Sequence, residues 1–511
     1  MVSKILSAGA DGISGYPVWT EVDVSQGLPA FDVVGLPDAA VKESRERVRA
    51  VVKNCGFDFP ARRITVNLAP ADKRKEGAVF DLPICIGILQ ATGQILANLS
   101  AFAFIGELSL SGDLRPIHGA LPIVMALKEA GVSAVFVPSE NGPEVSVVRG
   151  IQILPADHVM RVVDHLLGVL PILPLEPSDA VFQKETESFL DYADVAGQLL
   201  PKKALETAAA GGHNLLMIGP PGSGKSMLAK RIPSILPDMS FEEAIETTKI
   251  HSIYGLLSPD HPFVNTRPFR APHHTVSYAG MAGGGTYPRP GEISLAHNGV
   301  LFLDELPEYP KNVLEVLRQP LEDGAIRISR ANNTVEYPSR FMLVCAMNPC
   351  RCGFLGHPTK ACKCSPADID RYVSRISGPL LDRIDIQIEV PAVSYQELTG
   401  QERGESSAEI KKRVNRARQI QRERYKGTGV TCNAYLSGEL IRRHCALSPS
   451  ADKLLHAIFD QLTLSARGYD RILKVARTIA DLKGKETITE EEVAEASQYR
   501  ALDKKYFHSR R

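Results

Sequence analysis

The sequence has few aromatic residues, no net charge and no long apolar run. Aromatic residues make up 6% of the 511 positions, and Trp19 is the single tryptophan, so a fold built on stacked aromatic rings is not expected. Lysine and arginine total 59, as do aspartate and glutamate, so any nucleic-acid contact has to come from a local basic patch. No run approaches the roughly 18 apolar residues of a membrane-spanning helix, and we expect none.

The N-terminal residues also lack the continuous apolar core of a secretory signal. Nine cysteines occur in the chain, and four of them fall between positions 350 and 364. Scattered cysteines in a large chain without such a signal favour a reducing compartment, whereas a cluster of four favours a bound metal over a disulfide framework. We therefore predict a cytoplasmic protein with one metal centre.

Length and patterning predict a multidomain α/β protein of about three domains. Residues 1–170 mix strand-like alternation with helical patterns, which predicts an α+β domain, and the proline-rich polar stretch 171–190 predicts a linker. Residues 191–392 predict a core with a parallel sheet covered on both faces, because its strand-like runs are apolar throughout. Residues 393–511 are helical in pattern. The four strand-like runs are 214–218, 299–303, 341–346 and 384–390.

A phosphate-binding loop stands near the start of this core, between a strand-like run and a helix start. Its residues are Gly219, Pro220, Pro221, Gly222, Ser223, Gly224, Lys225 and Ser226. Loops of this pattern aim backbone N–H groups at phosphates, and the helix N-terminus adds partial positive charge. The motif predicts ATP as ligand, with Lys225 at the β and γ phosphates and Ser226 on Mg²⁺.

Polar residues follow two later strand-like runs of the core. Asp304 and Glu305 end the first of these runs. We predict that Asp304 holds Mg²⁺ through water and that Glu305 is the general base for the attacking water. Asn348 follows the other run, where it would orient the water or contact the γ-phosphate; an ordinary turn asparagine fits the same pattern.

Together these motifs resemble the AAA+ ATPases, and more closely their Mg-chelatase-like YifB/ComM family. The sequence segments that carry this closer resemblance are residues 194–198, 208–214 and 289–297. The resemblance covers essentially the whole chain. The resemblance implies a Lon-protease-like domain of the ribosomal S5 domain 2 type, then the ATPase core, then a helical lid of the magnesium-chelatase C-terminal type. It also implies a homo-oligomeric ring, expected to be a hexamer.

The resemblance assigns further residues. Residues 380–383 are similar to the family's arginine-finger motif, which places Arg383 in the neighbouring subunit's site to stabilise charge on the transferring phosphoryl group. A salt bridge of Arg383 with Asp382 or Asp385 is the alternative. Arg467 resembles the sensor-2 arginine that reaches the γ-phosphate from the lid, with Arg471 as a competing choice.

The function implied by the resemblance is an ATP-driven ring motor on DNA, with helicase and branch-migration activity in homologous recombination and natural transformation. The alternative is a Mg-chelatase-type or chaperone-like ATPase that remodels a protein complex. An active protease is disfavoured, because a Lon-type site needs a serine nucleophile and a lysine base. Asp81 stands where the serine is expected, and no lysine follows His118 until Lys128.

The long segment between Lys225 and Asp304 leaves room for an insertion that contains His273 and His274. The resemblance suggests a helix-2 insert that projects into the ring pore. A surface loop, or two histidines packed in a core, fits the sequence equally.

The clustered cysteines form two C-x-C pairs, made of Cys350, Cys352, Cys362 and Cys364. Four thiolates suit a structural Zn²⁺, and the intervening Gly353, Gly356 and Pro358 would bring the pairs together. His357 is a possible substitute ligand, and four unbound thiols are the alternative.

A helix predicted at 409–426 carries eight basic residues against two acids. It would contact a DNA backbone or form a solvated lid face or subunit contact.

Overall fold

The structure is a computed structural model that describes residues 2–178, 190–285, 288–330, 333–357, 359–393, 404–462 and 464–508. Contacts divide the chain into two compact units. The first unit comprises Met1–Glu185 and Phe241–Asn265, and the second comprises Thr186–Ser240 and Thr266–Arg511. Most of the predicted linker, like Pro358 of the cysteine loop, lies outside the described residues.

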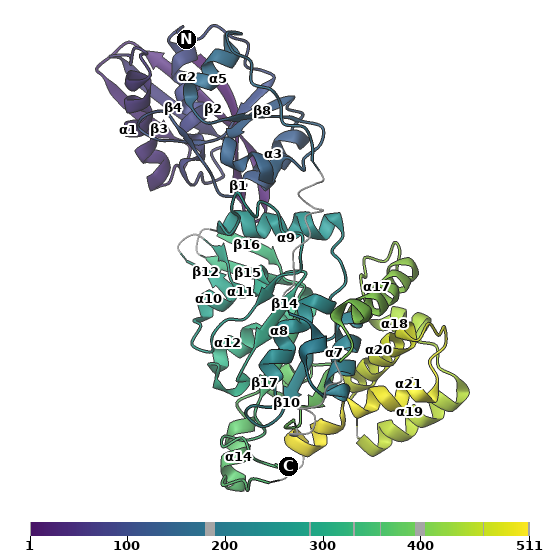
Figure 1. Cartoon of the computed structure of the whole chain (residues 1–511). Coiled ribbons are helices and arrows are strands. Elements are labelled where there is room, and N and C mark those ends of the chain that lie inside the picture. The colour runs from purple at the N-terminus through teal and green to yellow at the C-terminus, as the bar shows by residue number, and fades with distance from the viewer. Residues whose placement is uncertain are drawn as a thin grey trace. The chain divides into compact units, whose positions relative to one another are not determined.

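A seven-stranded sheet forms the centre of the first unit (Figure 1). Its order is β3 (Ala30–Val34), β4 (Arg63–Ala69), β2 (Ser14–Ser25), β1 (Val2–Asp11), β5 (Phe102–Phe104), β8 (Ala134–Pro138) and β9 (Gln152–Ala156). The helices of the N-terminal stretch are α1 (Ala39–Asn54), α2 (Asp81–Ala91), α3 (Ala120–Glu129), α4 (Gly142–Val145) and α5 (Val159–Leu166). Helix α2 is buried on nearly every face, which its almost continuous apolar sequence requires.

Two local elements of this unit follow from sequence patterns. The side chains of Val41, Val48 and Val52 are buried on one side of α1, whose N-cap Asp38 accepts a hydrogen bond from the Val41 amide. A hairpin around Gly112 is formed by the short antiparallel strands β6 (Glu107–Leu108) and β7 (Leu114–Arg115).

Helix α9 (Phe241–Tyr254) belongs to the first unit, although it follows the phosphate-binding loop in sequence. The Ser252 hydroxyl donates to Glu144 Oε1 at 2.5 Å, and the Gly119 amide donates to the Ser252 carbonyl. Glu144 also accepts from the Leu121 amide in the first turn of α3. These buried bonds place α9 in this unit, whereas the sequence pattern predicts one continuous core over 191–392.

The second unit contains the predicted parallel sheet. Its order is β11 (Phe269–Arg270), β14 (Val300–Leu303), β17 (Met342–Met347), β10 (Leu215–Ile218) and β18 (Ile386–Glu389), and every neighbouring pair is parallel. Every residue of β10, β14 and β17 is buried. The four strands expected from apolar runs are therefore confirmed, and β11 is an addition at the edge.

The helices and hairpins of the second unit flank this sheet (Figure 1). Before the C-terminal helices, the helices are α7 (Leu199–Gly211), α8 (Lys225–Ile235), α10 (Tyr278–Ala282), α11 (Glu292–Leu295), α12 (Lys311–Val316), α13 (Arg318–Asp323), α14 (Pro366–Val373) and α15 (Gly378–Leu381). The hairpins are β12 (Gly283–Gly284) with β13 (Arg289–Pro290) and β15 (Ala325–Arg330) with β16 (Asn333–Pro338). The sequence patterns did not predict either hairpin.

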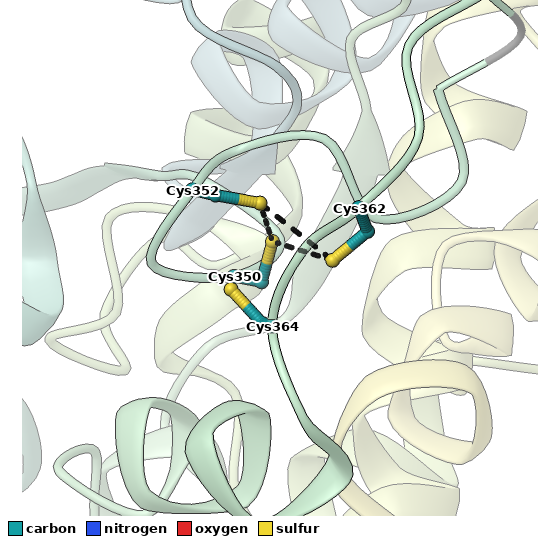
Figure 2. A group of neighbouring side chains, drawn as sticks. All are labelled: Cys350, Cys352, Cys362 and Cys364. Carbon is teal, nitrogen blue, oxygen red and sulfur yellow. Dashed lines mark hydrogen bonds between the residues drawn. The ribbon is translucent and has the colours of Figure 1, made fainter.

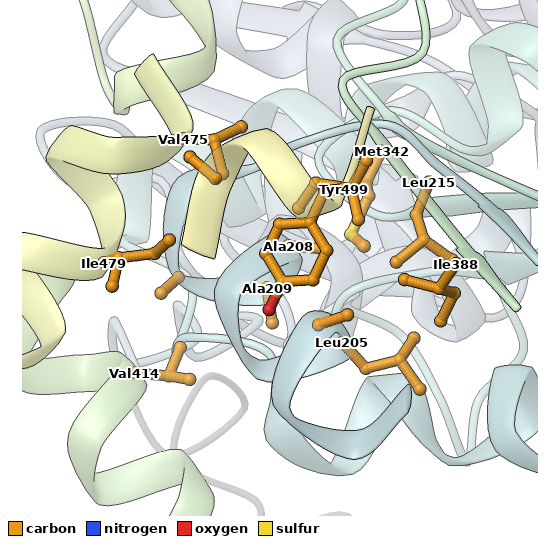
Figure 3. Packing of buried hydrophobic residues seen from close by; sticks show 14 of the residues in the cluster. Leu205, Ala208, Ala209, Leu215, Met342, Ile388, Val414, Val475, Ile479 and Tyr499 are labelled. Carbon is orange, nitrogen blue, oxygen red and sulfur yellow. The ribbon is translucent and has the colours of Figure 1, made fainter. Parts of the chain in front are cut away.

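The C-terminal helices share one apolar core with this sheet. They are α17 (Ser407–Arg424), α18 (Gly438–His444), α19 (Pro449–Leu462), α20 (Ala466–Leu482) and α21 (Glu490–Gln498). Ala208 and Ala209 of α7 meet Val475 and Ile479 of α20 and Val414 of α17 in this core (Figure 3). Among the described residues, no helix combines the length and apolar character needed to cross a bilayer.

Candidate nucleotide site and cysteine centre

The phosphate-binding loop leaves strand β10 and enters helix α8, as the motif predicts. A side chain at Gly219 is excluded, because its Cβ would lie 2.2 Å from the Val390 carbonyl oxygen at the end of β18. The loop therefore packs directly on the neighbouring strand. Gln198, at the N-cap of α7, donates from Nε2 to the carbonyls of Ser223 and Pro391. It thereby joins the loop to the segment that follows β18.

Lys225 is held by hydrogen bonds to oxygen atoms on two neighbouring segments. Its Nζ donates to the carbonyl oxygens of Gly219 and Pro220 at 2.8 and 2.9 Å, and to Asn348 Oδ1 at 3.2 Å. These three partners are neutral oxygens. Burial lowers the pKa of Lys225, and the Asp304 charge acts in the opposite direction. Phosphate would supply the counter-charge that burial makes favourable.

Ser226 and Asp304 meet at the carboxyl ends of β10 and β14. The Ser226 hydroxyl donates to Asp304 Oδ2 at 2.5 Å. A hydroxyl and a carboxylate are oxygen ligands of the kind that Mg²⁺ takes beside substrate phosphates. The residues therefore fit Mg²⁺ with ATP, and the structure brings together the predicted residues Lys225, Ser226, Asp304 and Asn348.

Glu305 follows with a backbone that non-glycine residues rarely adopt. Its φ is +52°, and its amide donates to Asp304 Oδ1 at 2.9 Å. Such strain is found where the surrounding structure fixes a functional side chain. The Glu305 carboxylate is 57% exposed and lies 3.5 Å from His274 Nδ1. It is therefore accessible to water, as a general base has to be.

The contact between His274 and Glu305 was not predicted from the sequence motifs. His274 lies in the loop between β11 and α10, with its ring 4.0 Å from that of His273. The Tyr309 hydroxyl donates to the Pro272 carbonyl at 2.6 Å and fixes this loop. No local signal joins position 274 to 305, because the contact depends on the placement of β11 beside β14.

Arg383 and Arg467 lie together, in a cavity of about 550 Å³. Both contact Glu322 Oε1, and the hydrogen bond from Arg383 lowers the pKa of Glu322 against the effect of burial. The described residues that line this cavity include none from the loop 219–226. Arg471 instead lies 3.6 Å from Asp385 and 4.0 Å from Asp382, so it takes the acids considered as partners for Arg383.

The four clustered cysteines converge, as Figure 2 shows. The Sγ atom of Cys350 lies 3.4 Å from that of Cys352 and 3.7 Å from that of Cys362, and the last two are 3.6 Å apart. All four ligand atoms, with that of Cys364, lie within 4.8 Å of one another. A tetrahedral site with Zn–S bonds of about 2.3 Å has sulfur atoms about 3.8 Å apart. The geometry fits Zn²⁺.

The surroundings of Cys352 and Cys350 shift their pKa values in opposite directions. Hydrogen bonding from the Phe354 backbone amide lowers the pKa of Cys352 to about 6, whereas burial raises the pKa of Cys350. His357 is not in the cluster. Its Nδ1 accepts hydrogen bonds from the amides of Thr359 and Lys360.

The cysteine loop packs on the nucleotide site. A Cβ on Gly353 would lie 2.6 Å from Pro221 Cδ of the phosphate-binding loop and 3.8 Å from Asn348 Cγ. Gly353 also has a φ of +82°, which favours glycine. The turn between the two cysteine pairs thus touches both the loop that would hold phosphate and the asparagine that contacts Lys225.

Asp81, at the position of the expected protease serine, is a buried ion-pair residue. It accepts from Arg47 Nε at 2.6 Å, from Arg47 Nη2 at 3.0 Å and from the Leu108 amide at 3.2 Å, besides the Ser44 hydroxyl. Lys128, the lysine nearest in sequence after His118, is exposed near the end of α3. At the position expected for the nucleophilic serine, the structure thus has an aspartate in a salt bridge with Arg47.

The basic helix α17 has most of its cations bonded within the chain. Salt bridges join Lys411 to Asp238, Lys412 to Glu409, Arg413 to Glu206 and Glu405, and Arg424 to Asp481. Arg418 and Arg422 donate to backbone carbonyls. This pattern favours the structural interpretation of the helix over a DNA-binding surface.

Comparisons with known proteins agree with these features. Family models described as magnesium chelatase subunit ChlI match residues 191–398 and 20–141, and the C-terminal model of that subunit matches 404–500. The competence protein ComM of Haemophilus influenzae is 46% identical over 506 residues, covering 98% of this chain and 97% of that protein. The uncharacterized protein YifB of Escherichia coli is 44% identical over 510 residues, 99% and 98% of the two chains. A Lon protease of Mycolicibacterium smegmatis is 28% identical over 207 residues, 39% of this chain and 23% of that protein.

Proposed function

The chain belongs to the Mg-chelatase-like YifB/ComM family of AAA+ proteins, and from this membership we propose that it is an ATP-driven ring motor that acts on DNA. The observation that carries the ATPase part is the convergence of Lys225, Ser226, Asp304, Glu305 and Asn348 at one edge of the parallel sheet. ATP would supply the phosphoanhydride bond that is broken. Mg²⁺ would supply positive charge that offsets the negative charge of the phosphates.

The residues of the chain have separate roles in hydrolysis. Lys225 binds the β and γ phosphates in place of its present carbonyl partners. Ser226 and Asp304 would hold Mg²⁺, which would supply positive charge beside the phosphates. Glu305 takes the proton of the attacking water while Asn348 orients that water. The exposed carboxylate of Glu305 and its contact with His274 support this division of roles.

We propose that the site is completed by a second copy of the chain. Arg383 lines a cavity that contains no described residue of the loop 219–226. We therefore propose that it contacts the nucleotide bound by a neighbouring subunit. Arg467 shares Glu322 with Arg383 and is assigned to the same nucleotide. A closed ring satisfies every such interface, and a hexamer is the proposed ring.

DNA is the proposed substrate of the motor, in branch migration and helicase work during recombination and natural transformation. The name of the Haemophilus influenzae relative, a competence protein, supports this choice. Helix α17 contributes little support, because its cations are mostly paired. We place this activity in the cytoplasm.

The experiment that tests the proposal is the ATP hydrolysis rate of the purified protein with no DNA, single-stranded DNA or forked DNA. We expect stimulation by DNA in the wild type and no hydrolysis in Lys225→Ala. Hydrolysis that is indifferent to all DNA would favour remodelling of a protein complex, the function class suggested by the magnesium-chelatase family models.

We also propose that Cys350, Cys352, Cys362 and Cys364 hold one structural Zn²⁺. The near-tetrahedral spacing of their sulfur atoms supports this assignment. The zinc would fix the turn at Gly353 against Pro221 and Asn348. Metal analysis of protein purified without chelator or a histidine tag is the direct test.

A further inference from the structure

A buried histidine stands between helix α7 and the strand that enters the phosphate-binding loop. His213 is 0% exposed. Its Nδ1 lies 3.2 Å from Asp385 Oδ2, and its Nε2 lies 2.7 Å from the Thr478 hydroxyl of α20. Because a carboxylate only accepts hydrogen bonds, Nδ1 carries a proton. One side chain therefore joins the segment before β18 to a C-terminal helix.

Asn214, the next residue, holds the same segment by a second set of bonds. Its Nδ2 donates to the Arg383 carbonyl at 2.8 Å, and its Oδ1 accepts from the Leu343 amide at 2.8 Å. Its backbone carbonyl accepts from the amides of Asp385 and Ile386 at 3.0 Å. Leu343 belongs to β17, the strand that ends at Asn348. Asn214 thus fixes both segments that carry the predicted arginine and asparagine.

The network continues from His213 into the C-terminal helices. Thr478 accepts from Asn433 Nδ2 at 2.9 Å, and Asn433 also donates to Asp481 at 2.8 Å. Asp481 is paired with Arg424 of α17 and Arg477 of α20. A buried polar network is stable only when its members are satisfied. The helix that carries Arg467 is therefore bonded to the segment that carries Arg383.

We infer that His213 and Asn214 are positioning residues for Arg383, which they fix relative to helix α20 so that it can reach a neighbouring subunit's nucleotide. This inference rests on the proposed role of Arg383. Between α15 and β18 the backbone at Arg383 has little regular structure of its own. Its amide donates to the Leu380 carbonyl and its side chain contacts Pro379 and Glu322, while Asn214 holds its carbonyl. Asp385, two residues later, is the common partner of His213 and Arg471.

Two substitutions divide the histidine's bonds. His213→Asn keeps an amide near Nδ1, and with it the Asp385 contact, whereas His213→Gln keeps one near Nε2, and with it the Thr478 contact. His456→Gln is the matched control, since His456 Nδ1 also lies near an aspartate, Asp460, at 3.4 Å, but is 81% exposed. Asn214→Ala is the second variant for the case in which a histidine variant does not fold.

The first readout uses the protein without nucleotide. Hydrogen–deuterium exchange at residues 383–386 is expected to rise at least fivefold in His213→Gln and Asn214→Ala. It should stay unchanged in His456→Gln, and exchange at 219–226 should change little in any variant. Unchanged exchange at 383–386 would overturn the inference.

The second readout mixes subunits. It distinguishes a defect in the phosphate-binding loop from a defect in the Arg383 that a subunit supplies to its neighbour. Alone, His213→Gln should bind a fluorescent ATP analogue within twofold of wild type and hydrolyse ATP at least tenfold more slowly. Mixed with Lys225→Ala, it should regain hydrolysis, because interfaces form in which the partner supplies an intact Arg383. Mixed with Arg383→Ala, it should regain none.

The opposite mixing pattern would mean that His213 supports its own phosphate-binding loop and would overturn the inference. The reference mixture, Arg383→Ala with Lys225→Ala, tests the proposed function separately. If that mixture gives no recovery, the role of Arg383 in the neighbouring site fails. If it recovers and His213→Gln does not, only the inference about His213 fails.

Discussion

Replacing Asp81 by serine is expected to destabilise the first unit without creating a protease. The change puts a hydroxyl where a Lon-type nucleophile would stand, but no lysine base lies beside it in the described contacts of Asp81. A serine without its base is a poor nucleophile. We therefore expect no turnover of casein or peptides by Asp81→Ser or by the wild type.

The cost of this change follows from the bonds that Asp81 makes. Its side chain is 0% exposed, and that of its partner Arg47 is 21% exposed. Removing one member of a buried pair costs about 3–5 kcal/mol, and the partial exposure of Arg47 favours the lower end, about 3 kcal/mol. With a urea m-value of about 2 kcal/mol/M, the unfolding midpoint should fall by about 1.5 M.

Fluorescence of Trp19 is the assay, because this single tryptophan lies on β2 of the first unit. Asp113→Ser is the matched control: Asp113 accepts hydrogen bonds from Ser109 and Ser111 in the same unit, but it is exposed. Its midpoint should hardly move. Equal midpoints for the two variants would refute the account of Asp81, and peptidase activity dependent on residues of this unit would refute the account of the domain.

Three further predictions concern the second unit. Lys225→Ala should abolish ATP hydrolysis, and Glu305→Gln should bind ATP but hydrolyse it about 10²–10⁴-fold more slowly, since glutamine keeps the shape and loses the base; turnover near that of wild type in Glu305→Gln would contradict its role. Arg383→Ala should bind nucleotide and hydrolyse poorly, and mixing it with Lys225→Ala should restore hydrolysis; absence of rescue would mean that the finger is another residue or that Arg383 acts within its own chain. Cys352→Ser should lose zinc by metal analysis and lower ATP turnover more than ATP binding; a protein free of zinc whose Cys352→Ser variant is fully active would leave four reduced thiols.

Local patterns predicted the elements of the nucleotide site well. The apolar runs before Gly219, Asp304 and Asn348 became buried parallel strands, because such runs have few other ways to be covered on both faces. The carboxyl ends of parallel strands share one edge. The contacts between Lys225 and Asn348 and between Ser226 and Asp304 follow from that geometry.

Contacts that depend on distant segments were not predictable in the same way. His274 meets Glu305, and His213 meets Asp385 and Thr478, across 31, 172 and 265 positions of sequence. A lone histidine carries no periodic signal, and its partners are fixed only once the sheet and helices are in place. The assignment of α9 to the first unit likewise depends on the buried Glu144, which no local motif marks.

The most direct test of the DNA-motor proposal is strand displacement on a forked duplex in which one strand carries a fluorophore and the other a quencher. With ATP and Mg²⁺, the wild type is expected to separate the strands at a rate that depends on ATP, and Glu305→Gln is expected to bind the fork without separating it. An active ATPase that neither separates nor migrates any branched DNA, and whose turnover DNA does not change, would contradict the proposal.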